Sequence, residues 1–409
     1  MLARLAGLGS VCDFRVIDSR IDKELFFEVE VWIMKNKKRD AAIELMRVIA
    51  CFLVICIHVA SGFYVAGGFS RGAALLGCLR ADAVAFFWFI TGAFLFRKDA
   101  YGKVLKGMLT KVFAPAFALI LFIFLFEGWM FGGQSMWGSI SGAMTSLPTM
   151  LYCVFFRWAT PVAYSGQLWY VFAYVFAMIC FPVLKAFVDK IEAAKKEKVF
   201  FGISFGFLVL NDISNNAIGG FSHTATGALI PAAILMIWGH FLYRKKDEIL
   251  KRVNKWYCLL AFLGANILRW GIMLVNHKWG DGNLDMGILY WFSGFGVIST
   301  VALFLFLEGF AGGLAKRDFV SGAICKIGSY TFVIYLLHEL VIAVLDKFGV
   351  IGGMKGSLLA RGGIARILLC DLGLGLMVFG LSFVGGIVLR LVKNGAIKAH
   401  AMIGERKRG

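Results

Sequence analysis

Long apolar runs follow one another along most of this sequence, and they constrain its fold more than any other feature. Such runs can cross the hydrocarbon core of a bilayer, which is about 30 Å thick. Hydrophobic residues make up 60% of the 409 residues and charged residues only 17%, which excludes an ordinary soluble protein. Because the runs are continuous rather than alternating, they indicate helices and not barrel strands. We therefore predict an all-α polytopic membrane protein, a bundle of about ten transmembrane helices.

The basic residues predict how this bundle lies in the membrane. The predicted spans cover residues 43–64, 80–96, 112–128, 167–187, 199–213, 226–242, 256–275, 287–307, 328–346 and 366–391. Basic runs such as KNKKR (35–39) and YRKKDEILKRVNK (243–255) fall on alternate connections, and such runs stay in the cytoplasm. We expect a multi-pass protein of the inner or plasma membrane with both termini cytoplasmic. Topology and contact with membrane lipids then explain the net charge of +18, so nucleic acid is not an expected partner.

The N-terminal segment and the cysteines add no chemistry to this picture. Residues 1–33 mix charges with a short alternating stretch and lack the apolar region of a signal peptide, so we treat them as an appendage without assigned function. Residues 34–409 form the membrane domain, and Met34 would be a sensible start. The nine cysteines are scattered without a CxxC pair, so neither a disulfide framework nor a metal site is predicted.

Ionisable residues inside the predicted spans are the candidates for function, because burying a charge in a bilayer is costly. In the first span Arg47 and His58 are eleven residues apart, which brings both to the same helix face within about 20° and separates them by about 16 Å. Glu44 lies one turn before Arg47 and can pair with it. The remaining candidates lie in later spans and are Arg80, Asp82, Lys111, Glu127, Arg269, His338 and Glu339. Together they indicate a polar cavity within a helix bundle.

Five sequence blocks narrow this interpretation to one family. They are IELMRVIACFLVICIHV (43–59), RADAVAFFWFITGAFLFRK (80–98), LTKVFAPAF (109–117), GQLWYVFAYVFAMICFPVLK (166–185) and YTFVIYLLHELVI (330–342). In this order the blocks resemble those of the acyltransferase 3 family of membrane-bound acyltransferases along most of residues 40–392. Within that family the chain looks most like the O-acetyltransferases of bacterial envelope glycans, such as the enterobacterial common antigen type. Three positions depart from the family pattern, namely Ala85, Gln167 and Glu339.

The resemblance implies that acetyl-CoA is the acyl donor and that a hydroxyl of an envelope glycan or lipid-linked sugar is the acceptor. His58 would act as the general base, since an imidazole is well matched to removing a hydroxyl proton. A carboxylate would orient its ring, and Asp82 and Glu127 are both possible partners. Arg80 would stabilise the thioester oxyanion or hold the acceptor. The CoA-binding candidates are Arg47, Lys111 and Glu44, and the acceptor-binding candidates are Trp169, Gln167 and His338.

Structural roles compete with each of these assignments. His58 and His338 could simply form hydrogen bonds between packed helices. Arg47 could form a structural ion pair with Glu44, and Lys111, like Lys106, could extend to the lipid headgroups. At the level of the whole protein, the alternative is a secondary transporter that binds a solute with its intramembrane charges, although no inverted repeat or pair of broken helices is evident in the sequence.

The predicted exterior segments are where a sugar would be met. The longest, residues 129–166, is rich in aromatic residues and contains an apolar stretch at 147–158 that is too short to span, so we expect it to lie at the interface or to dip back into the membrane. Two further exterior loops, 211–226 and 276–285, carry amide, carboxylate and aromatic side chains.

Overall fold

The computed structural model describes residues 40–60, 64–65, 68–160, 162–213, 227–279, 293–314, 318–359 and 363–406. The predicted appendage 1–33 and most of the two exterior loops 211–226 and 276–285 lie outside these residues. The described chain is helical apart from a two-residue antiparallel ladder, β1 (Tyr64–Val65) with β2 (Gly68–Phe69), which confirms the all-α prediction.

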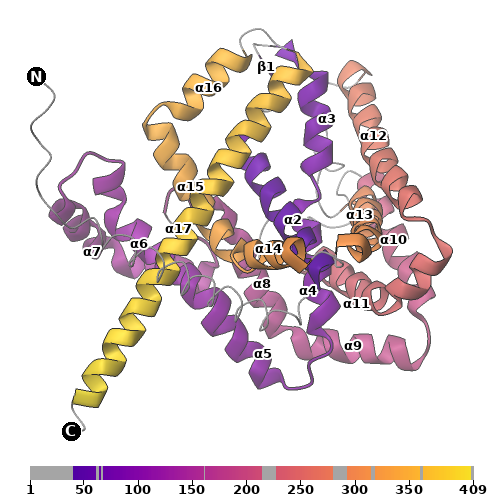
Figure 1. Cartoon of the computed structure of the whole chain (residues 1–409), viewed down its shortest axis with the longest axis horizontal. Coiled ribbons are helices and arrows are strands. Elements are labelled where there is room, and N and C mark those ends of the chain that lie inside the picture. The colour runs from indigo at the N-terminus through magenta and orange to yellow at the C-terminus, as the bar shows by residue number, and fades with distance from the viewer. Residues whose placement is uncertain are drawn as a thin grey trace, which may run out of the picture.

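The helices follow the chain in the order shown in Figure 1. Their bounds are α2 (Ala41–Val59), α3 (Arg71–Arg80), α4 (Ala83–Leu95), α5 (Tyr101–Met108), α6 (Ala114–Met130), α7 (Met136–Tyr152), α8 (Trp169–Ile179), α9 (Phe181–Ala193), α10 (Glu197–Ile213), α11 (Leu229–Arg252), α12 (Lys255–Trp279), α13 (Gly294–Leu314), α14 (Asp318–Gly328), α15 (Thr331–Lys347), α16 (Val350–Leu359) and α17 (Ile364–Arg406). Short π or 3-10 turns, η1 (Leu109–Phe113), η2 (Cys153–Arg157) and η3 (Gly166–Leu168), lie between them.

The number of candidate membrane spans differs from the predicted ten. By length and composition, seven of the described helical segments could cross a bilayer, or up to nine if two bent helix pairs each count as one span. Helices α10 and α11 lie where spans were expected, but α10 has only 17 residues and the second half of α11 is highly charged. The bent pairs are Gly166–Ile179 with Phe181–Ala193, at 64°, and Phe319–Gly328 with Thr331–Lys347, at 56°.

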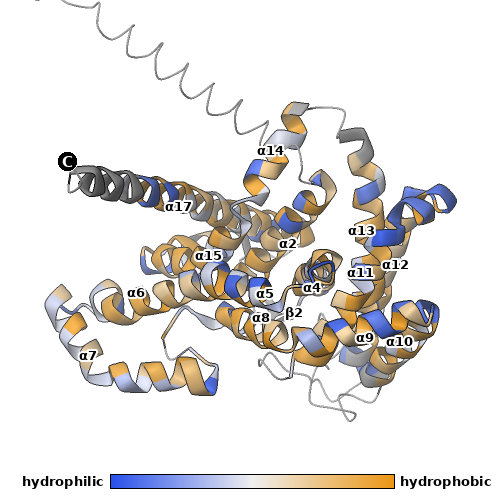
Figure 2. Ribbon diagram, turned by 90° about the horizontal axis from the view of Figure 1, so that it is seen from below, coloured by the Kyte–Doolittle hydropathy of each residue, from blue (hydrophilic) through white to orange (hydrophobic). Residues whose placement is uncertain are grey.

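The segment expected at the exterior also proved different. The stretch at 147–158 is not isolated, because small and hydroxyl residues before it continue the same helix, and Met136–Arg157 forms 22 residues that could cross a membrane. This helix packs against α6, and Phe155 near its end contacts Phe113 at the end of η1 and Phe117 in the first turn of α6. In both views the pair α6 and α7 lies to one side of the bundle (Figures 1 and 2).

The centre of the bundle is built around α2, which contacts α3, α4, α13, α14, α15 and α17. The closest helix contact joins α4 to α11, and glycine makes it possible. A Cβ on Gly92 would lie 1.8 Å from the Met236 carbonyl oxygen, and one on Gly239 would lie 2.0 Å from that of Phe89. Without a side chain at either position the two backbones can touch, as small residues allow in membrane helix pairs.

Charged side chains mark one end of the bundle, where α2 begins. The Asp40 carboxylate caps α2 through the Ala42 amide, at 3.1 Å, and accepts hydrogen bonds from Lys246 and from the Tyr243 hydroxyl, both at 2.8 Å. Lys246 also donates to Glu308, at 2.7 Å. Burial opposes ionisation of Asp40, but the hydrogen bond and charge of Lys246 keep its pKa below the usual value. We call this the basic end, and Figure 2 shows hydrophilic turns around α5, α9 and α10.

Candidate active site

The candidate active site begins with a histidine and a glutamate from helices far apart in the sequence. His58 lies in the last turn of α2, and Glu339 lies in the middle of α15. Their side chains meet with the His58 Nδ1 atom 2.7 Å from the Glu339 Oε1 atom. The His58 side chain is 32% exposed and that of Glu339 16%. A carboxylate on Nδ1 fixes the ring and leaves Nε2 as the nitrogen available to a substrate.

His338, next to this pair, is fully buried and has a defined tautomer. Its Nδ1 atom lies 2.6 Å from the Tyr335 carbonyl oxygen. Because a carbonyl oxygen only accepts, Nδ1 carries the proton and Nε2 is an acceptor. Within the part of the chain that the structure describes, this Nε2 atom is buried without a hydrogen-bond partner. The ring centroid lies 5.1 Å from that of His58, so the site contains a second acceptor nitrogen.

The predicted acceptor-binding residues before α8 also reach this region. The Gln167 side chain is buried and donates through Nε2 to the Leu336 carbonyl oxygen, at 3.3 Å. Its own backbone carbonyl accepts a hydrogen bond from the Tyr335 hydroxyl. Trp169 follows as the first residue of α8 and packs beside Tyr170, with 6.1 Å between the ring centroids. The structure thus places Gln167 against the turn of α15 that precedes His338.

A column of three tyrosines leads from the site toward the basic end. The ring centroids of His338 and Tyr335 are 5.7 Å apart, those of Tyr335 and Tyr170 5.9 Å, and those of Tyr170 and Tyr174 6.5 Å. Arg47 lies close enough to Tyr170 and Tyr174 to interact with both electrostatically. The tyrosine column, Tyr174, Tyr170 and Tyr335, therefore connects the predicted CoA-binding arginine to the histidines.

At the basic end of this column there is a cavity of about 580 Å³. Tyr174 lines it, together with three lysines, Lys98, Lys103 and Lys111, and one carboxylate, Asp99. We call it the basic cavity. Arg47 is held by Glu44, at 2.6 Å, which confirms the predicted pairing one turn apart. Glu44 is itself packed against α14, where a Cβ on Gly328 would lie 2.3 Å from its Oε2 atom.

Arg80 and Asp82, both predicted to act with His58, are paired with other residues. Asp82 forms two hydrogen bonds with Arg269, at 3.0 and 3.1 Å, and both side chains are almost completely buried. Arg80 donates to Asp371, at 3.0 Å. Glu127 lies at the end of α6, so the structure places neither expected carboxylate against His58. Glu339 is there instead, because α15 packs directly on α2.

The three side chains of the candidate active site, His58, His338 and Glu339, also have the donor set of a metal site. His58, His338 and Glu339 offer two imidazole nitrogens and a carboxylate oxygen that all lie within 4.8 Å of one another. Two histidines with a glutamate also form some catalytic zinc sites. The sequence predicts no metal site, and whether these three side chains bind a metal is a question for experiment.

A helical membrane protein with an imidazole held by a carboxylate and a cavity lined by lysines has the groups that acid–base chemistry requires. Residues 40–390 match the profile of the acyltransferase 3 family, described as an acyltransferase domain. This covers most of the chain, so the protein belongs to that family and is an integral membrane acyltransferase with an acyl donor and an acceptor. Comparison with curated proteins and with solved structures gave no match.

Proposed function

We propose that this protein transfers an acetyl or other short acyl group from cytoplasmic acyl-CoA to a hydroxyl of an envelope glycan or glycolipid, with His58 as general base. The observation that carries the proposal is the 2.7 Å contact between the His58 Nδ1 and Glu339 Oε1 atoms. It orients the ring and stabilises the positive charge that forms on it, as a carboxylate does in a hydrolase triad. Glu339 takes the orienting role that Asp82 was expected to have.

The chemical step is a direct transfer. The acceptor hydroxyl gives its proton to His58 Nε2 while its oxygen attacks the thioester carbonyl carbon, and a tetrahedral oxyanion forms. The carbon–sulfur bond then breaks, the CoA thiolate leaves, and the proton on His58 passes to the sulfur. His338 Nε2 can accept a hydrogen bond from a neighbouring hydroxyl of the acceptor. Arg80 stays the candidate for stabilising the oxyanion, and its pairing with Asp371 would hold it in place.

The donor would bind with its phosphates in the basic cavity. CoA is a polyanion with a long thin arm, and Lys98, Lys103 and Lys111 supply positive charge where α2 begins. From Arg47 to His58 the helix rises about 16 Å, so an arm that follows the tyrosine column would bring the thioester to the imidazole. This arrangement requires the basic end to face the cytoplasm, which is the orientation that the positive-inside rule predicts.

The test is acyl transfer by the purified full-length protein in lipid nanodiscs. Wild type should move labelled acetyl groups from acetyl-CoA to an envelope glycan extract, and His58→Ala should lower the rate by about 10²-fold or more. His240→Ala, at a buried histidine of α11, is the matched control and should keep the activity. Unchanged transfer by His58→Ala would remove the proposed base. Activity should also persist in EDTA; a loss that zinc restores would assign the three side chains to a metal.

One observation favours a second candidate, a secondary transporter. Transporters often bind substrate where helices are broken, and the two bent pairs meet through Gln167 and Tyr335, close to His338. Solute counterflow in proteoliposomes without consumption of acetyl-CoA would support this candidate, whereas acetyl transfer without counterflow would support the acyltransferase.

A further inference from the structure

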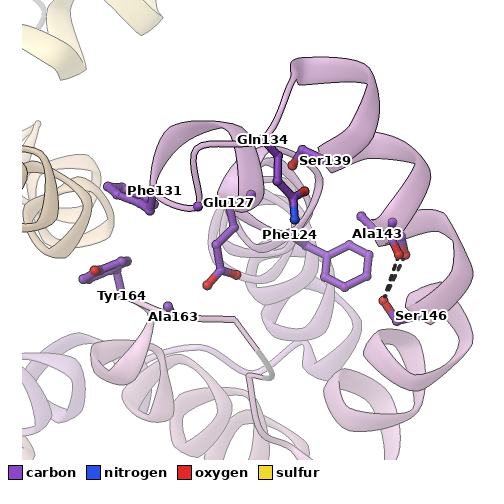
Figure 3. A pocket seen from close by; sticks show the side chains of 12 residues that line it. Phe124, Glu127, Phe131, Gln134, Ser139, Ala143, Ser146, Ala163 and Tyr164 are labelled. Atoms are coloured by element: carbon purple, nitrogen blue, oxygen red, sulfur yellow. Dashed lines mark hydrogen bonds between the residues drawn. The ribbon is translucent and has the colours of Figure 1, made fainter.

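A second cavity, of about 520 Å³, opens between α6 and α7 at the end opposite the basic cavity, and the two share no lining residue. None of its lining residues is basic. Its polar groups are a carboxylate, a carboxamide and three hydroxyls, from Glu127, Gln134, Ser139, Ser146 and Tyr164. Figure 3 shows Glu127 and Gln134 extending into the opening, with Phe131 and Tyr164 on one side of it. We call it the neutral cavity.

Two aromatic rings form that side of the neutral cavity. The ring centroids of Phe131 and Tyr164 are 4.8 Å apart at an interplanar angle of 47°. Tyr164 has a left-handed backbone conformation, with φ at 52°, which non-glycine residues adopt at a cost of about 1–3 kcal/mol. The surrounding fold therefore holds this ring in place against a local preference. An apolar ring face beside a few polar groups is typical of a small-molecule site.

The main polar side chains of the cavity are free to bind a ligand. Within the described part of the chain, neither the Glu127 carboxylate nor the Gln134 carboxamide forms a hydrogen bond, and the Tyr164 hydroxyl forms none. Ser139 and Ser146 donate to backbone carbonyls, at 2.8 Å for Leu125 and 3.2 Å for Ala143, and keep their acceptor lone pairs. Among the described lining residues there is a carboxylate and no positive charge, which disfavours an anionic ligand. Donors and acceptors without partners suit a ligand rich in hydroxyls.

Glycines give the cavity its shape. A Cβ on Gly128 would lie 2.4 Å from the Gln134 Oε1 atom, so the bare backbone there makes room for the carboxamide. A Cβ on Gly142, by contrast, would meet nothing within 4 Å, because this residue faces the open space. A large side chain at Gly142 would consequently fill the cavity without displacing protein atoms.

A direct contact connects the neutral cavity to the candidate active site. The Lys347 ammonium group at the end of α15 donates to the Met130 carbonyl oxygen and lies 6.0 Å from the Phe131 ring centroid. Glu339 is eight residues earlier in the same helix, or about 12 Å away along its axis. A glycan in the cavity could therefore extend along α15 and present a hydroxyl to His58.

The geometry points to the neutral cavity as the subsite for an uncharged sugar ring of the acceptor glycan. The aromatic pair would cover the ring's apolar face, and Glu127 and Gln134 would bind its hydroxyls. This inference rests on the proposed function, since it names the chemistry of the acceptor: a neutral glycan, held one or more units away from the hydroxyl that is acylated.

Equilibrium binding of labelled chitotriose and maltotriose to the full-length protein in nanodiscs tests the subsite. Wild type should bind at least one of the two. Gly142→Phe and Glu127→Gln should weaken binding by about tenfold or more, and Gly380→Phe, at an exposed α17 glycine whose Cβ also meets nothing within 4 Å, should leave it unchanged.

Two outcomes would overturn the subsite: neither oligosaccharide binds, or binding survives Gly142→Phe. A co-purified phospholipid that Gly142→Phe displaces, with no sugar bound, would assign the cavity to lipid instead. Transfer activity is measured on the same samples. Transfer without oligosaccharide binding would reject the subsite and keep the proposed function. Binding without transfer would keep the sugar site and reject the proposed acyl transfer.

Discussion

Two pairs of opposite charge inside this bundle show how differently similar residues can be used. Asp82 and Arg269 join α3–α4 to α12 with both side chains sealed, at 1% and 0% exposure, and Arg269 also donates to the Ser293 hydroxyl and the Cys78 carbonyl oxygen. Within the described residues, the Arg269 Nε atom has no hydrogen-bond partner. His58 and Glu339 join α2 to α15 with 32% and 16% of their side chains accessible. Beside them lies the buried His338 Nε2 atom, which has no hydrogen-bond partner among the described residues.

The difference indicates which pair is structural. A pair without accessible surface cannot be reached by a substrate, and its members stabilise each other against the cost of burial. The His58–Glu339 pair is partly accessible and lies beside the unused acceptor atom of His338, so it can bind a ligand. The predictions below test whether stability depends on the first pair and acyl transfer on the second.

The largest expected effect concerns stability. Arg269→Ala would leave the Asp82 carboxylate buried and uncompensated, and breaking such a pair costs about 3–5 kcal/mol. We expect a large fall in the melting temperature of the protein in detergent, followed by intrinsic tryptophan fluorescence. The double variant Arg269→Met with Asp82→Leu, which removes both charges, should recover much of the loss. If Arg269→Ala melts like wild type but loses transfer, the pair is not structural.

The next effect concerns rate. Glu339→Gln keeps the shape of the side chain but removes the charge that stabilises the His58 imidazolium, so kcat should fall by about 10²-fold while KM for acetyl-CoA and the melting temperature stay the same. Steady-state kinetics in nanodiscs measure this. Glu192→Gln, at the surface beside Arg244, is the control. A variant with unchanged kcat would show that the contact with His58 serves packing.

A smaller effect is expected at the basic cavity. Lys111→Ala should raise KM for acetyl-CoA by about threefold to tenfold at low salt, with kcat little changed, because an exposed lysine contributes a screened phosphate contact. Lys106→Ala is a close control, since this neighbouring lysine does not line the cavity. Equal effects of both substitutions would mean that the two lysines act only on the membrane surface.

The smallest effect concerns pH. Because the pKa of Asp40 is lowered in the fold, its ionised form adds stability above the pKa of the unfolded chain, near 3.9, and this contribution is lost as pH falls below that value. Asp40→Asn keeps the cap of α2 and should cost about 1 kcal/mol or less at pH 7, and this cost should shrink as pH falls through the lowered pKa of the folded chain. Melting curves across this range measure the difference, and a cost that does not change with pH would show that the charge of Asp40 does not contribute to stability.

Local features of the site could be predicted from sequence, and non-local ones could not. The pairing of Glu44 with Arg47 was predicted because residues three apart on a helix must be neighbours, and the structure confirms it. Predicted depth in the membrane pointed to Asp82 and Glu127 as partners of the His58 imidazole. The true neighbour, Glu339, was noted as an intramembrane charge and as a departure from the family pattern, but no local rule joins two residues that are 281 positions apart.

The count of spans shows the same limit. Hydropathy found the helical runs, but it missed that small residues before Leu147 extend an apolar stretch into the helix Met136–Arg157, and that two predicted spans are bent pairs. Bends and re-entrant segments depend on how the neighbouring helices pack, and a hydropathy pattern carries no information on that packing.

The sequence alone determined that this chain is a helical membrane protein of the acyltransferase 3 type, because apolar length, charge distribution and short motifs are properties of single segments. Only the tertiary structure decided which ionisable groups meet, that Asp82 belongs to Arg269 and His58 to Glu339, and that one cavity is basic and the other neutral. The physical reason is that burial and pairing of charge depend on how helices pack, and many packings are compatible with the same pattern of apolar runs.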